Sequence, residues 1–161
     1  MKVKRLLLPI KGSPGDEDMV RFACELTRSG HGSIYALYVI EVPRDQALDA
    51  ELPEQTQQAE EILRWVEETA KEHKGVVSAS LLQARDSGPA IVEEAVERDV
   101  DLLLMGTVYK RKYGSFSLGA TLPYVLQHAP CQVLALRRPM SDGTPLIAGN
   151  NSGESKSGED Q

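Results

Sequence analysis

The chain has 161 residues, enough for one domain with a hydrophobic core and short for two. Apolar residues make up 41% and charged residues 26%, which is ordinary for a soluble globular protein. The formal net charge of −6 argues against nucleic-acid or anionic-membrane partners, because both require a basic surface. No apolar run approaches the length of a transmembrane helix. The apolar run near the start, LLLPI, is too short for a signal peptide, so we expect a cytoplasmic protein.

Strand and helix patterns alternate along the chain. Short apolar runs, rich in Leu, Val and Ile, predict buried strands, and apolar positions at helical spacing predict helices between them. The predicted strands cover residues 3–10, 33–42, 76–84, 101–106 and 131–136. The predicted helices cover residues 14–30, 54–74, a segment opened by Gly88 and Pro89 with Ile91, Val92, Ala95 and Val96 on its apolar face, and 122–129.

This alternation predicts an α/β fold, a five-stranded parallel sheet with helices on both faces and right-handed crossovers. Ligands of such sheets bind at the carboxyl ends of the strands, near the point where the strand order reverses. The loops expected at that edge are 11–15, 41–53, 85–88 and 106–118. The domain is expected to span residues 1–139. Residues 140–161 are rich in Gly, Ser and Asn, which predicts a disordered tail.

A glycine-containing bridge, MGTVYKRKYGSFSLGAT, joins the fourth strand to the fourth helix. Such a bridge is a common way to hold a phosphate, and Lys110, Arg111 and Lys112 add positive charge. Two plainer interpretations stay open. Gly106 and Gly119 serve equally well to shape the strand exit and the helix entry, and the basic run suits a solvated turn.

Four segments resemble the universal stress protein family over roughly residues 3–137. They are LLLPIKGS, LYVIEV, SGPAIVEEA and MGTVYKRKYGSFSLGATLPYVLQHAPCQVLAL. The resemblance implies a Rossmann-like sandwich of the adenine nucleotide alpha hydrolase-like type, and a homodimer that pairs through the fifth strand. An exposed apolar edge strand would otherwise remain. Some members of the family bind ATP in the glycine-containing loop, and others lack the motif and do not.

The resemblance also implies a set of nucleotide-contacting positions. The residues at these positions are Pro9, Ile10, Lys11, Val39, Met105, Gly106, Tyr109, Gly119, Ala120 and Thr121. The chain departs from the family pattern in four places. Lys11 replaces the usual Asp, Tyr109 replaces the second glycine, Ala120 replaces a serine, and Leu122 replaces a hydroxyl residue, although Thr121 is adjacent.

These departures predict weak or absent ATP binding. A hydrogen bond to a charged group contributes about 1.5–3 kcal/mol, so losing two hydroxyls costs roughly 3–6 kcal/mol. Exposed charge pairs contribute only about 0–1 kcal/mol each, so the basic run recovers part of the loss. The leading hypothesis is therefore a regulatory or protective domain with a degenerate ATP site. The alternatives are a nucleotide sensor with an altered Gly106–Gly119 loop, or a site for a smaller phosphate.

Catalysis and metal binding are not expected. The three histidines show no metal-ligand spacing, and Cys24 and Cys131 suit reduced core positions. No Ser-His-Asp constellation is visible. Asp16, Glu17 and Asp18 suit the first turn of a helix, where acidic side chains stabilise the helix dipole.

Overall fold

The computed structural model describes residues 2–107, 110–112 and 115–137. Its main elements alternate as predicted. They are β1 (Arg5–Ile10), α1 (Asp16–Arg28), β2 (Ser33–Glu41), α2 (Pro53–Glu72), β3 (Val77–Ala84), α3 (Ser87–Glu97), β4 (Leu102–Thr107), β5 (Lys110–Lys112), β6 (Ser115–Ser117), α4 (Thr121–His128) and β7 (Gln132–Arg137). The predicted disordered tail, 140–161, lies outside the described residues and stays a prediction.

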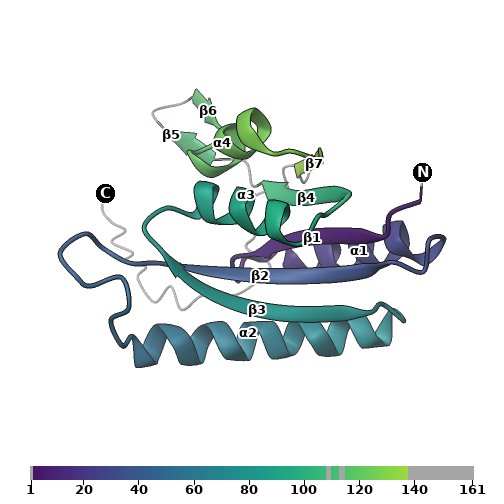
Figure 1. The fold of residues 1–161 in the computed structure, drawn as a ribbon, viewed down its shortest axis with the longest axis horizontal. Coiled ribbons are helices and arrows are strands. Elements are labelled where there is room, and N and C mark those ends of the chain that lie inside the picture. The colour runs from purple at the N-terminus through teal and green to yellow at the C-terminus, as the bar shows by residue number, and fades with distance from the viewer. Residues whose placement is uncertain (1, 108–109, 113–114, 138–161) are drawn as a thin grey trace, which may run out of the picture.

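The main sheet has five parallel strands in the order β3-β2-β1-β4-β7 (Figure 1). This confirms the predicted α/β fold class. The strand order reverses at β1, because β2 pairs with one side of β1 and β4 with the other. The carboxyl ends of β1 and β4 therefore flank the switch point at which ligands of this architecture bind.

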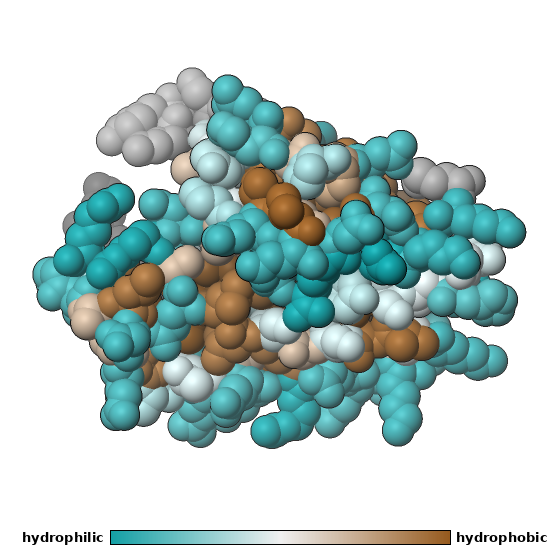
Figure 2. Space-filling model, in the orientation of Figure 1, coloured by the Kyte–Doolittle hydropathy of each residue, from teal (hydrophilic) through white to brown (hydrophobic). Residues whose placement is uncertain are grey.

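Helices cover both faces of the sheet, and each face has its own apolar core, whereas hydrophilic residues cover much of the outer surface shown in Figure 2. Leu6 and Leu8 of β1 pack with α1 and α2, whereas Leu7 packs with α3 and α4. Successive side chains of a strand point to opposite faces, so one run of three leucines contributes to both cores. Figure 1 shows α2 beneath the β2–β3 side of the sheet, with α3 and α4 on the opposite face.

The structure differs from the predictions in two places. The segment expected as a loop, 106–118, contains a short antiparallel pair, β5 and β6. Val96, expected on the apolar face of α3, is 59% exposed, so this prediction was wrong. The buried face of α3 contains Ile91 and Ala95, which are one helical turn apart. Val96 follows Ala95 and is rotated about 100° around the helix axis, so its side chain points away from this face.

None of the helices in the described ranges is both long and apolar enough to cross a bilayer. Cys24 is buried and Cys131 is half-buried, and both thiols are free.

Candidate functional site

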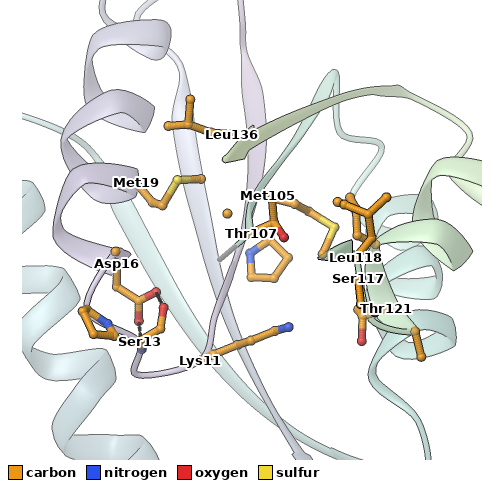
Figure 3. A pocket seen from close by; sticks show the side chains of 16 residues that line it. Lys11, Ser13, Asp16, Met19, Met105, Thr107, Ser117, Leu118, Thr121 and Leu136 are labelled. Atoms are coloured by element: carbon orange, nitrogen blue, oxygen red, sulfur yellow. Dashed lines mark hydrogen bonds between the residues drawn. The ribbon is translucent and has the colours of Figure 1, made fainter. Parts of the chain in front are cut away.

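A cavity of about 350 Å³ lies at the carboxyl ends of β1 and β4, between the first turns of α1 and α4 (Figure 3). Segments far apart in the sequence form its walls. The lining residues are Pro9, Lys11, Ser13, Pro14, Gly15, Asp16, Met19, Met105, Gly106, Thr107, Ser117, Leu118, Ala120, Thr121, Leu122 and Leu136. The cavity therefore occupies the edge at which the sequence predicted a ligand.

Most of the residues predicted to contact a nucleotide line this cavity. These are Pro9, Lys11, Met105, Gly106, Ala120 and Thr121. Ile10 and Val39 do not. Ile10 is 2% exposed and belongs to the core beside α1 and α2, and Val39 packs against the core beside α3 and α4. Gly119 precedes the lining residues Ala120 and Thr121, and Tyr109 lies outside the described residues.

Several lining residues were missed by the sequence reasoning. Met19 reaches the cavity from α1 and Leu136 from β7, as Figure 3 shows. No local pattern marks either residue, because only the strand order brings α1, β4 and β7 together. Ser13 and Asp16 carried a usable signal. They follow a strand end, where Ser and Asp often fold the backbone into a turn.

The loop between β1 and α1 is folded around the carboxylate of Asp16. Oδ2 accepts hydrogen bonds from the backbone N–H groups of Gly12 (2.8 Å) and Ser13 (3.1 Å), and Oδ1 accepts one from the Ser13 hydroxyl (3.0 Å). Gly12 has a φ of 76°, a left-handed conformation that glycine adopts without strain. Asp16 is 6% exposed. Burial raises the pKa of its carboxyl group, although these hydrogen bonds act in the opposite direction.

Lys11 provides the positive charge of the cavity as the structure describes it. In Figure 3 its side chain extends from the β1–α1 loop towards Ser117 and Thr121 on the opposite wall. The residue is exposed, and its ammonium group makes no hydrogen bond or ion pair with another described residue. A cation in this position is free to pair with an anionic ligand.

The α4 side of the cavity has room for a ligand next to the backbone. Gly119 has a φ of 74°, and a Cβ atom built there meets nothing within 4 Å. Glycine is thus needed for its conformation and not to avoid a clash. The Gly119 N–H donates to the Ser117 hydroxyl at 3.2 Å. The first turn of α4 carries no acidic residue and has no side-chain cap.

A second cavity, of about 550 Å³, lies behind the β1–α1 loop and against α2. Its lining includes Ile62 and Trp65 of α2 and Arg21 of α1. Ser13, Pro14 and Asp16 line both cavities. The loop that Asp16 folds is therefore a wall shared by the two.

A parallel sheet in this order, with a cavity at its switch point, defines a Rossmann-like α/β protein of the adenine nucleotide alpha hydrolase-like type. Residues 2–137 match the universal stress protein family, and the chain belongs to it.

Curated relatives and solved structures agree with this assignment. A universal stress protein of Methanocaldococcus jannaschii is 27% identical over 148 residues, covering 86% of this chain and 85% of the relative. One of Methanothermobacter thermautotrophicus is 29% identical over 141 residues, covering 83% and 95%. Two structures share the fold at low identity. One is a universal stress protein in complex with cAMP (TM-score 0.67, 18% identity, 85% and 98% covered). The other is the Archaeoglobus fulgidus protein in complex with dAMP (0.66, 20%, 84% and 98%).

Proposed function

We propose that this chain is a non-catalytic, regulatory or protective stress protein that binds an adenine nucleotide with one phosphate more tightly than it binds ATP. The observation that carries the proposal is the cavity at the switch point, with the unpaired Lys11 above it and Thr121 opposite. Two proteins of the same fold have structures described as complexes with cAMP and dAMP, each of which has one phosphate.

The substitutions at the start of α4 argue against tight triphosphate binding. Ala120 offers no hydroxyl to a phosphate, and Leu122 is 5% exposed and packs in the apolar core. A volume of about 350 Å³ is also near the small end of ligand cavities, which span about 300–1,000 Å³. One phosphate needs fewer donors than three, so Lys11 and Thr121 supply a larger share of what it requires.

A regulatory role fits the side chains of the cavity better than catalysis does. The lining of the cavity, as the structure describes it, includes no histidine or cysteine. The Asp16 carboxylate is engaged with the backbone of its own loop, and the Ser13 hydroxyl donates to that carboxylate. The carboxylate beside the Ser13 hydroxyl also accepts two backbone N–H groups, which makes it a weaker base than the histidine that usually activates a serine nucleophile.

Calorimetry with AMP, cAMP and ATP tests the proposal. We expect saturable binding of a monophosphate, and ATP binding at least about tenfold weaker, because the lost hydroxyls each contribute more than 1 kcal/mol. Lys11→Ala should weaken AMP binding and reduce its salt dependence. Lys71→Ala removes an equal charge from the last turn of α2 and should leave affinity unchanged. Tighter binding of ATP than of AMP would refute the preference, and no binding of any nucleotide at millimolar concentration would refute the function.

A second candidate function is an ATP sensor that uses an altered Gly106–Gly119 loop. It is favoured by Thr121, whose side chain lines the cavity next to the position of the lost hydroxyl. This candidate predicts tight ATP binding that weakens when Lys110, Arg111 and Lys112 are changed together to Ala. Unchanged ATP affinity in that variant would remove the basic run from the mechanism.

We also propose that the chain forms a homodimer through β7. Among the strands that the structure describes, β7 has a neighbour only on its β4 side, and Leu134 is 36% exposed. An apolar edge strand is a template for pairing with a second chain. Sedimentation at micromolar concentration should show a dimer, and Leu134→Lys should shift it towards monomer. A wild-type monomer would refute this proposal.

A further inference from the structure

The conformation of the β1–α1 loop determines both the position of Lys11 and the wall between the two cavities. The loop carries Lys11 at the mouth of the first cavity, and its residues Ser13, Pro14 and Asp16 separate that cavity from the second. Lys11 is exposed, and its ammonium group donates no hydrogen bond and forms no ion pair with another described residue. Its direction therefore depends on the backbone that follows it.

That backbone is held from within by one side chain. Oδ2 of Asp16 accepts hydrogen bonds from two successive backbone N–H groups, those of Gly12 and Ser13, and Oδ1 accepts one from the Ser13 hydroxyl. The Asp16 N–H in turn donates to the Ser13 carbonyl at 3.0 Å. Gly12, which donates the first of these hydrogen bonds, has the left-handed φ of 76°. Without an acceptor at position 16, nothing described in the structure would hold both groups there.

We propose that Asp16 is a positioning residue for nucleotide binding: it folds residues 12–16 so that Lys11 extends across the cavity towards Thr121. This inference rests on the proposed function. Asp16 acts through Lys11 and needs no contact with the nucleotide itself. Asp16 is 6% exposed, and its carboxylate accepts hydrogen bonds from its own loop, which suits a role in holding that loop in place.

The geometry predicts a distinction between two substitutions. In Asp16→Asn the amide oxygen accepts both backbone hydrogen bonds, and the amide nitrogen donates to the Ser13 hydroxyl, which is also an acceptor. In Asp16→Ala all three hydrogen bonds are lost. The Asn variant should therefore keep the loop folded, and the Ala variant should release it.

A double-mutant cycle with AMP, measured by calorimetry, tests the coupling to Lys11. Lys11→Ala and Asp16→Ala should each weaken AMP binding by about tenfold, and the double variant should be little weaker than either, because both remove the same contact. Asp16→Asn should bind like the wild type. Glu17→Gln is the matched control, since it removes one acidic charge from the same helical turn and lines only the second cavity. Additive effects, or an Asn variant as weak as the Ala variant, would overturn the proposal.

Amide hydrogen exchange, followed by NMR without ligand, tests the loop separately. Exchange at Gly12 and Ser13 should be about tenfold faster in Asp16→Ala than in the wild type or Asp16→Asn, because the acceptor is lost. Unchanged exchange would overturn the proposal whatever nucleotide binds. If the wild type binds no nucleotide, the proposed function fails, and the exchange rates still decide whether Asp16 folds the loop. Should the Ala variant not fold, Asp16→Leu replaces it, because leucine has no acceptor and fills a similar space.

Discussion

The helices α1 and α4 begin at the same cavity, yet their first turns have opposite character. The first turn of α1 carries Asp16, Glu17 and Asp18, which stabilise the positive end of the helix dipole. The first turn of α4 has no acidic residue and no side-chain cap. The positive end of the α1 dipole is thus compensated by acidic side chains of the same helix. The positive end of the α4 dipole has no such compensation and can interact with an anionic ligand in the cavity. A phosphate should therefore bind at the α4 end, and the uncharged part of a nucleotide nearer α1.

The largest effect is expected on AMP affinity, when an acidic residue is placed in the first turn of α4. Thr121→Asp places a carboxylate in the cavity wall and removes a hydroxyl. Two like charges about 6 Å apart at an effective dielectric of about 20 repel by roughly 2–3 kcal/mol, so AMP binding should weaken about a hundredfold. The helix itself should not be destabilised, because an acidic residue is favourable at that end. Calorimetry checks the affinity and urea unfolding the stability. AMP affinity equal to that of the wild type would mean that the phosphate does not bind near α4.

Gly119→Ala should have the next largest effect, and should act on stability. The left-handed φ of 74° costs a non-glycine residue about 1–2 kcal/mol, and open space around the Cβ position adds no clash. Urea unfolding should show this loss. Ala120→Gly is the control in the same loop, since φ at Ala120 is −95° and the free energy should change by only a few tenths of a kcal/mol. A stability loss well above 2 kcal/mol would show that the Cβ position is occupied.

Removing an acidic residue from α1 should have a smaller effect. Glu17→Gln weakens the favourable interaction with the helix dipole and the exposed ion pair with Arg21, which together stabilise by roughly 0.5–1 kcal/mol. The loss should shrink at high salt, because exposed charges are screened. AMP affinity should stay unchanged, because Glu17 lines only the second cavity. A gain in AMP affinity would mean that the phosphate binds near the α1 end, because the substitution removes a negative charge that would repel it there.

Asp16→Asn should change AMP affinity least of these variants, and its effect on stability should depend on pH. Burial raises the pKa of Asp16 above its ordinary value of 3.8, so protonation favours the folded chain. That contribution is fully present below the ordinary pKa and is lost as the pH rises through the raised folded-state pKa. The Asn variant does not titrate here. Its unfolding free energy should therefore rise relative to the wild type as the pH increases from the ordinary pKa of 3.8 through the raised folded-state pKa. A change in the opposite direction, measured by urea unfolding, would show that the hydrogen bonds outweigh burial.

The sequence predicted the main sheet well because its signals were local and repeated. Each buried strand is a compact apolar run, and glycine or proline marks most helix boundaries. The β5–β6 pair was missed because three-residue strands are too short to show a period. Val96 was misplaced for a related reason. Consecutive apolar residues at 95 and 96 cannot both face the same side of a helix, and the sequence does not say which one does.

The candidate site was predictable in location and only partly in composition. Loops after β1 and β4 were expected to meet, and Lys11, Gly106 and Thr121 do line one cavity. Met19 and Leu136 could not be found from local patterns, because their presence follows from the strand order. Asp16 was expected only as a charge favourable to the helix dipole. Its hydrogen bonds with the N–H groups of Gly12 and Ser13 require the chain to turn back on itself. The residue types in this loop allow such a turn, but the sequence alone does not predict it.

The wall shared by the two cavities gives the molecule a built-in optical reporter. Trp65 is the only tryptophan in the chain, it is 38% exposed, and it lines the second cavity together with Ser13 and Pro14. Movement of residues 12–16 should change the surroundings of this indole ring, so tryptophan fluorescence should report on the loop without an attached label. A ligand that binds in the first cavity and shifts this loop should therefore change the fluorescence of Trp65 in the second cavity.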